Sequence, residues 1–255
     1  MPQRRWLILN RTRPHSQQAN GISEMTDWII GGLLAIILLG VVLYWQLAIA
    51  EGAYLGRTVV MWLYDWFAPR YDNVKQFRPA LDTVMLAMPI MKHLNQRTGA
   101  TGAIPQVLDV ATGTGRMPQT LLVQKNFTGN ITALDLSERM LAIGRAKLSA
   151  YADRITWLKQ DAQHLPFDDN YFDVVTSLEA LEFLPHPRNA LLEMVRVLKP
   201  GGLLIVTNRV GPDAWKMPGR TQSTGALAAW LEQQGLHDIQ PDTWLVDYDL
   251  VSAIK

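Results

Sequence analysis

One long apolar run stands out near the N-terminus of the chain. Residues 28–50 carry no charged side chain, and Asp27 and Glu51 flank them on either side. At a rise of ~1.5 Å per residue, a helix of this length crosses a bilayer core of ~30 Å. Trp28 and Trp45 lie near its two ends, where aromatic side chains favour the membrane interface. The run predicts one transmembrane helix; the alternatives are a buried core helix and a cleaved signal peptide, and its length disfavours both.

The segments on either side of this run are more polar. Residues 1–27 are rich in Arg, Gln and Asn and predict a disordered tail. Residues 51–98 predict juxtamembrane helices that lead into the following domain. Within them, 55–71 mixes aromatic and charged side chains, so this part either lies in the membrane interface or packs on a soluble core. A helical apolar pattern over 79–98 is expected to be interrupted near Pro89.

Short apolar runs alternate with helical segments over residues 99–255. Strands that alternate with helices predict an α/β domain with a mostly parallel sheet. The last run alternates polar and apolar residues, which predicts an antiparallel edge strand at the C-terminus. The expected strands are 106–110, 131–134, one from 155 to its exit at 161, one ending at 177, 203–207, 237–239 and 244–254.

Composition narrows the possible chemistry. The 255 residues are 48% hydrophobic and 18% charged, and the net charge of +1 gives no argument for a nucleic-acid partner. The chain has no cysteine, which excludes disulfides, a thiolate nucleophile and cysteine-ligated zinc. Its five histidines are scattered without metal-ligand spacing, so no metal is expected.

The candidate chemistry centres on residues 107–116, Val-Leu-Asp-Val-Ala-Thr-Gly-Thr-Gly-Arg. An apolar strand that carries Asp109 breaks into a turn containing Gly113 and Gly115, and a helix follows. Glycine lets the backbone bend sharply and approach a ligand, so the unit predicts a nucleotide-like ligand. A dinucleotide fingerprint fails, because Pro118 occupies its third glycine position. A Walker loop fails as well, because no Gly-Lys-Ser/Thr is present.

What remains is an acid in the strand followed by small-x-Gly-x-Gly, with Ala111 at the small position. This stretch resembles motif I of the class I S-adenosylmethionine (SAM) methyltransferases, where alanine is a common variant. Asp135 ends the next apolar run, 20 residues after Gly115, and a carboxylate at that spacing suits a hold on two ribose hydroxyls. The resemblance implies that Gly113 and Gly115 pass close to the methionyl part of SAM. It also implies that Asp109 organises the loop and the methionine amine.

Three further stretches, 64–72, 165–177 and 196–202, resemble the ubiquinone/menaquinone-biosynthesis methyltransferase family. The resemblance covers roughly residues 64–255. It implies a Rossmann-like seven-stranded sheet with helices on both faces and SAM across the carboxyl ends of the first strands. It further implies that Tyr71, with Asp72, helps close the cofactor pocket.

The adenine end of the cofactor has its own candidate residues. Asp161 leaves the third strand at the carboxyl edge, where an acid can accept a hydrogen bond from the adenine amine. The N–H of Ala162 could meet a ring nitrogen. Leu136 and Met140 follow Asp135 in a loop that the resembling family places over the adenine. The alternatives are a solvated loop acid for Asp161 and simple core packing for Met140.

Residues 177–183, after the fourth strand, carry two acids, Glu179 and Glu182. Many relatives carry histidine near Glu182, so this chain departs from them. Either carboxylate could orient or deprotonate the acceptor, or could stabilise cationic charge. Glu179 is favoured because it is the first acid off the strand. The alternative for both is a helix-initiating acid without chemistry.

These features predict a membrane-anchored, SAM-dependent methyltransferase that acts on a small, lipid-like acceptor such as a quinone or a phospholipid amine. A soluble acceptor and a non-catalytic, SAM-binding membrane scaffold are the alternatives. An oxidoreductase of the Rossmann type is disfavoured by Pro118. The expected partners are the lipid bilayer and the acceptor, with no nucleic acid.

The expected location is a single-pass membrane protein whose catalytic domain faces the cytoplasm, where SAM is made. The positive-inside rule opposes this orientation, because four arginines precede the apolar run. Translation from Met25 rather than Met1 would remove them and leave Asp27 on that side. The start residue is therefore part of the prediction.

Overall fold

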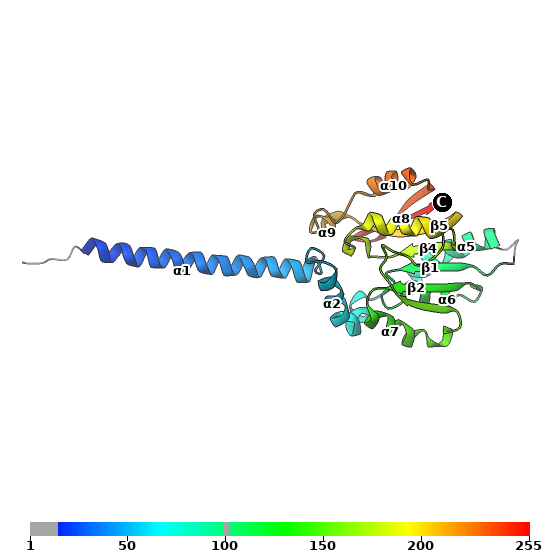
Figure 1. The fold of residues 1–255 in the computed structure, drawn as a ribbon, viewed down its shortest axis with the longest axis horizontal. Coiled ribbons are helices and arrows are strands. Elements are labelled where there is room, and N and C mark those ends of the chain that lie inside the picture. Colours follow the sequence, from blue (N-terminus) through cyan, green and yellow to red (C-terminus); the bar gives the residue numbers. More distant parts are fainter. Residues whose placement is uncertain (1–14, 99–101) are drawn as a thin grey trace, which may run out of the picture. The chain divides into compact units, whose positions relative to one another are not determined.

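The computed structural model describes residues 15–98 and 102–255, which divide into two compact units. In the first unit, which ends at Leu47, α1 runs from His15 to Tyr44 and continues into a π-helical turn, Trp45–Ile49 (Figure 1). Residues 25–49 are long and apolar enough to cross a membrane, and their large apolar side chains are exposed, as at Ile36.

The N-terminal tail differs from the sequence expectation. Residues 1–14 lie outside the described part of the chain, but residues 15–27 are helical rather than disordered. An established helix extends at little cost, because each added residue gains one backbone hydrogen bond. The polar residues 15–27 therefore continue the helix that the adjacent apolar residues form.

The second unit, Ala48–Lys255, begins with a series of short helices. They are α2 (Arg57–Phe67), a 3₁₀ turn (Ala68–Arg70), α3 (Tyr71–Lys75), α4 (Pro79–Asp82), a π-helical turn (Thr83–Ala87) and α5 (Met88–Thr98). The π turn ends two residues before Pro89, whose ring would collide with the carbonyl four residues earlier, at Met85, in an ordinary helix. The expected interruption is therefore present as a widened turn.

The α2 helix presents two different faces. Val60, Met61 and Tyr64 line a pocket of the domain, whereas Trp62 and Trp66 are 64% and 61% exposed. The expectation that 55–71 packs on the domain is met by the first face. Contact of the two tryptophans with lipid stays a prediction.

A seven-stranded sheet forms the centre of the unit, as expected. Its order is β3-β2-β1-β4-β5-β7-β6, in which β3, β2, β1, β4 and β5 run parallel to one another. Figure 1 labels β2, β1, β4 and β5 among these strands, at the centre of the unit. The strands are β1 (Gln106–Val110), β2 (Asn130–Asp135), β3 (Ile155–Lys159), β4 (Phe172–Ser177), β5 (Leu198–Arg209), β6 (His237–Leu245) and β7 (Tyr248–Ile254). The remaining helices are α6 (Arg116–Leu122), α7 (Glu138–Lys147), α8 (Pro187–Val197), α9 (Gly211–Trp215) and α10 (Thr224–Gln233), with 3₁₀ turns at Ser149–Tyr151 and Leu181–Phe183.

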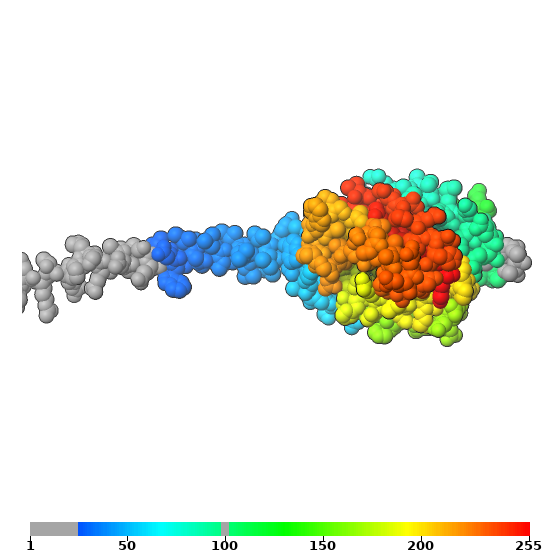
Figure 2. All heavy atoms as spheres, turned by 90° about the horizontal axis from the view of Figure 1, so that it is seen from above, coloured from blue at the N-terminus to red at the C-terminus, as the bar shows by residue number. Residues whose placement is uncertain are grey.

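Both faces of the sheet are covered by helices. Successive residues of a strand point to opposite faces. Val107 accordingly packs in a core with α5 and α6, while Leu108 packs in a second core with α8 and α10. The segment from α9 to the C-terminus, orange to red, gathers on one face of this unit (Figure 2).

The C-terminal strands depart from the prediction. A turn at Val246 and Asp247 divides the expected 244–254 strand, and β7 pairs with both β5 and β6 in antiparallel fashion. The edge strand is therefore β6, not the terminal strand. Burial explains the order, because Leu250 and Val251 point to opposite faces of the sheet and both are buried. Pro241 lies in the edge strand, where its missing N–H is tolerated.

Candidate cofactor-binding and active site

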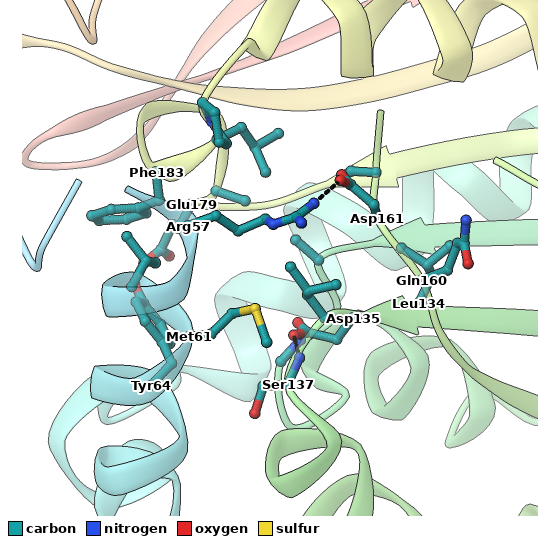
Figure 3. A pocket seen from close by; sticks show the side chains of 18 of the residues that line it. Arg57, Met61, Tyr64, Leu134, Asp135, Ser137, Gln160, Asp161, Glu179 and Phe183 are labelled. Atoms are coloured by element: carbon teal, nitrogen blue, oxygen red, sulfur yellow. Dashed lines mark hydrogen bonds and ion pairs between the residues drawn. The ribbon is translucent and has the colours of Figure 1, made fainter. Parts of the chain in front are cut away.

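The carboxyl ends of β1, β2 and β4 converge on one pocket of about 120 Å³. The glycine loop after β1, the turn after β2 and the loop after β4 form its floor, and α2 forms the opposite wall (Figure 3). Ligands of open α/β sheets bind at this edge. Most of the predicted cofactor residues line it: Tyr71, Ala111, Gly113, Asp135, Leu136, Asp161 and Ala162, with Glu179.

The glycine loop turns sharply by placing three residues in the left-handed region. The φ angles are +56° at Ala111, +56° at Gly113 and +82° at Gly115. At Gly113 an added Cβ would meet only the Tyr71 ring at 3.8 Å, on the side of the pocket. At Gly115 it would lie 2.8 Å from the Trp157 indole. Gly113 therefore keeps the pocket open. Gly115 instead lets the loop pack on Trp157, and it lines neither this pocket nor a second, smaller cavity beside it, which is described below.

Asp135 is held at the end of β2 by backbone donors. Its Oδ2 accepts a hydrogen bond from the N–H of Gly113 at 2.8 Å, and its Oδ1 accepts one from the N–H of Ser137 at 2.8 Å. Burial raises the pKa of this carboxyl, and the backbone donors oppose the rise. A carboxylate oxygen can accept more than one hydrogen bond, so the carboxylate can also receive two neighbouring hydroxyls. This carboxylate acceptor fits the hydroxyl donors of a ribose.

The two apolar candidates after Asp135, Leu136 and Met140, take different positions. The Ser137 hydroxyl accepts a hydrogen bond from the N–H of Met140 at 3.1 Å and caps α7. Leu136 lines the pocket, as expected. Met140 is 1% exposed and does not line it, so core packing describes this side chain.

Asp161 has an unexpected partner. Nη1 of Arg57, on α2, lies 2.5 Å from its Oδ2 and crosses the pocket to reach it (Figure 3). The N–H of Gln163 donates to its Oδ1 at 3.0 Å. The acid expected to meet the adenine is therefore already paired. No local sequence signal points to Arg57, which is 104 residues away.

A smaller hollow of about 20 Å³ lies beside the pocket and is lined by Tyr71, Asp109, Ala111 and Glu179 among others. The Thr176 hydroxyl donates to Oδ1 of Asp109 at 2.6 Å. Burial raises the pKa of Asp109 to about 7, against the hydrogen bonds it accepts. A carboxylate here fits the amine of a methionyl group. Tyr71 borders both cavities, and burial raises the pKa of its phenol.

Asp72 is not on the cofactor side. Its carboxylate accepts hydrogen bonds from the Thr114 hydroxyl and from Nζ of Lys147, the latter at 2.8 Å. These contacts attach α3 to the glycine loop and to α7. Tyr71 therefore takes up the expected position at the pocket, while Asp72 ties its helix to the loop.

Glu179 lies at the centre of a buried charge network. Its Oε1 is 2.7 Å from Nη1 of Arg116, and its Oε2 is 2.9 Å from Nζ of Lys75. Arg116 also holds Asp82 with two hydrogen bonds, of 2.7 and 2.9 Å. Burial alone would raise the pKa of Glu179, but Lys75 and Arg116 outweigh it and lower the pKa. The group is a carboxylate at neutral pH, which makes it a poor proton acceptor.

Glu182 points elsewhere. It is 2% exposed, accepts a hydrogen bond from the Tyr248 hydroxyl and lies 3.4 Å from Nε of Arg209. Burial raises its pKa. It does not line the pocket that Glu179 lines. The structure therefore does not bring the two candidate acids together.

Comparisons with known proteins agree with this geometry. Residues 108–206 match the family described as "Methyltransferase domain". The ubiquinone/menaquinone biosynthesis C-methyltransferase UbiE of Roseobacter denitrificans is 36% identical over 160 residues, which cover 62% of this chain and 61% of that protein. The demethylmenaquinone methyltransferase of Lactiplantibacillus plantarum is 34% identical over 60% of this chain and 64% of its own length. The match thus spans under two thirds of these relatives.

Solved structures show the same fold. The DszA carbon methyltransferase superposes with a TM-score of 0.58 at 15% identity, over 77% of this chain and 66% of that one. Identity at this level supports the fold alone. The likeness confirms the expected fold, and the match to a methyltransferase domain supports the expected cofactor, SAM. Residues 108–206 are thus similar to a methyltransferase domain, in agreement with the resemblance seen in the sequence.

Proposed function

We propose that this protein is a membrane-anchored, SAM-dependent methyltransferase that acts on a quinone-type or related lipophilic small molecule. The acceptor class is supported by the names of the two relatives above, each of which names a quinone. The anchor is supported by the apolar helix over Met25–Ile49. A lipophilic acceptor and a membrane anchor are mutually consistent, because such an acceptor resides in the bilayer.

The observation that carries the proposal is the cradle made by Gly113 and Asp135. The backbone N–H groups of Gly113 and Ser137 fix the Asp135 carboxylate, and the missing Cβ of Gly113 keeps the space beside it open. The neighbouring walls, Leu134, Leu136 and Ala162, are apolar and suit a purine ring. In this proposal the apolar slot receives the adenine, Asp135 the ribose and Asp109 the methionine amine of SAM.

SAM, when bound, supplies an electrophilic methyl group on a sulfonium centre. In this proposal Asp135 orients the ribose and Asp109 the amine. The aromatic side chains of Tyr64, Tyr71 and Phe183 border the pocket and exclude water from it. Alignment of donor and acceptor then supplies most of the rate enhancement. Glu179 stays charged, so its role is to orient the acceptor or to attract cationic charge rather than to take a proton.

In this proposal the protein crosses the membrane once and its catalytic domain faces the cytoplasm. This orientation satisfies the positive-inside rule if translation starts at Met25, because the arginines before that residue are then absent. Mass spectrometry of the native N-terminus tests the start. Peptides from residues 4–24 would contradict it.

The function is tested by transfer of label from methyl-labelled SAM into a lipid extract of the host membrane, with the full-length protein. We expect a labelled lipid whose formation is lost in Gly113→Asp, because the new side chain enters the cradle. Gly225→Asp is the matched control: Gly225 lies in the first turn of α10 with nothing near its Cβ direction, so activity should persist. SAM binding without label in any acceptor would instead support a non-catalytic scaffold. Label in soluble molecules alone would contradict the lipophilic acceptor.

A further inference from the structure

A second cavity, of about 420 Å³, lies between the loop after β4 and the loop after β5. Its lining shares only Pro185 with the pocket at Asp135. The polar and charged side chains that line it include Glu182, His186, Arg188, Asn208, Arg209 and Arg220. Neither the methyl-transfer proposal nor the comparisons assign a role to this cavity.

The cavity is strongly basic. Three arginines line it against one carboxylate, that of Glu182. This carboxylate is already compensated, because the Tyr248 hydroxyl donates to it and Arg209 lies beside it. Within residues 15–98 and 102–255, neither Arg188 nor Arg220 forms an ion pair. The uncompensated charge of the lining is therefore positive.

Arg220 is held in place rather than free to turn to solvent. Its Nη1 donates to the carbonyl of Leu184 at 3.0 Å, and its Nη2 donates to the carbonyl of Ala53. The guanidinium also lies over the Tyr54 ring, 5.3 Å from the centroid. A guanidinium has five N–H donors, so these contacts leave some of them for a ligand. An anion would meet a preorganised donor.

The α8 helix begins at the same cavity. His186, the residue before its first turn, makes no side-chain capping bond, and Pro187, Arg188 and Asn189 line the cavity. The 11-residue helix directs the positive end of its dipole toward this end, although Pro187 has no N–H and the N–H of Asn189 already donates to the carbonyl of His186. Helix N-termini of this kind favour phosphate groups.

We propose that this cavity binds a phosphate group, either of a phosphorylated small molecule or of a phospholipid headgroup. Its volume falls in the range of small-molecule sites, 300–1,000 Å³ by order of magnitude. The basic lining, the fixed Arg220 and the start of α8 would all attract the negative charge of the same ligand. The site is independent of methyl transfer and stands whether or not the pocket at Asp135 is catalytic.

The test uses the full-length protein in a maltoside detergent that contains no phosphate. Inorganic phosphate and glycerol 3-phosphate are titrated by calorimetry at low salt. We expect saturable binding that Arg188→Glu weakens about tenfold or more, because a charge-assisted hydrogen bond is lost and a repulsive charge is added. Arg188 is exposed, so its substitution leaves the core intact.

Arg139→Glu is the matched control, because Arg139 is exposed on α7, away from the cavity, and this substitution changes the net charge by the same amount. The phosphate affinity of this variant should match that of the unmodified chain. If phosphatidic acid in mixed micelles competes with inorganic phosphate, the site binds a phospholipid headgroup. If it does not compete, the site binds the phosphate of a soluble small molecule. No saturable binding, or equal weakening by both variants, would overturn the proposal.

Discussion

Nη1 of Arg57 lies 2.5 Å from Oδ2 of Asp161, and this contact joins α2 to the loop after β3 across the mouth of the cofactor pocket. The pocket measures about 120 Å³ with this contact made. Sites for molecules the size of a nucleoside are larger, about 300–1,000 Å³. We infer that α2 or the Arg57 side chain moves when the cofactor enters.

Removing this contact should therefore ease cofactor binding. In Arg57→Gln the Asp161 carboxylate is free to accept from the adenine amine, and we expect faster SAM association and an affinity several-fold higher, on the order of 1 kcal/mol. The loss of folding stability should be below about 1 kcal/mol, because the Arg57 side chain is 54% exposed. Stopped-flow fluorescence measures the rate, with Arg139→Gln as the control. Weaker SAM binding in Arg57→Gln would show that Arg57 holds the cofactor rather than blocks it.

Replacing Asp109 by asparagine should raise the folding stability of the ligand-free chain and weaken SAM binding. Burial raises its pKa from 3.8 to about 7, so the protonated form is favoured in the folded state. The stabilisation is complete below pH 3.8 and is lost as the pH rises through about 7. The difference in Tm between the neutral isostere Asp109→Asn and the unmodified, ligand-free chain should therefore shift in favour of the variant as the pH rises from 5 to 8.

The same substitution should weaken SAM binding about tenfold, because the amide offers no charge to the methionine amine. Thermal unfolding at pH 5 and 8 and calorimetry at pH 8 make the two measurements. A Tm difference that does not change with pH would contradict the buried, pKa-shifted carboxyl.

Glu179 should contribute stability at neutral pH through its two cations. Glu179→Gln leaves Lys75 without its partner and Arg116 with Asp82 alone, which we expect to cost about 3 kcal/mol. The pKa of Glu179 is lowered, so this contribution is present above about pH 4.5 and is lost as the pH falls through the lowered pKa. Denaturant unfolding at pH 7 and pH 3 measures it. An equal loss at both pH values would indicate a packing defect instead of a lost ion pair.

Local spacing was enough to predict the floor of the site. A strand, a glycine turn and an acid 20 residues later placed Asp109, Gly113 and Asp135 correctly, because short loops force their positions at one edge of a parallel sheet. The helix cap at Ser137 also follows from local sequence.

Contacts between distant segments could not be predicted. Arg57, the partner of Asp161, and Lys75, one of the two cations beside Glu179, come from the helices before the sheet and carry no spacing signal. The role of Gly115 required knowing that Trp157 packs on it. The final hairpin was missed because Val246-Asp247 contains none of the glycine or asparagine turn signals.

The most direct test of the central claim is equilibrium binding of SAM to the unmodified chain and to Asp135→Ala, with the exposed Asp168→Ala as control. We expect saturable SAM binding that Asp135→Ala weakens about tenfold to a hundredfold, since two charge-assisted hydrogen bonds to ribose are lost. Asp168→Ala should bind as the unmodified chain does, and NAD should not bind. Unchanged SAM affinity in a folded Asp135→Ala protein, or binding of NAD in place of SAM, would contradict the account.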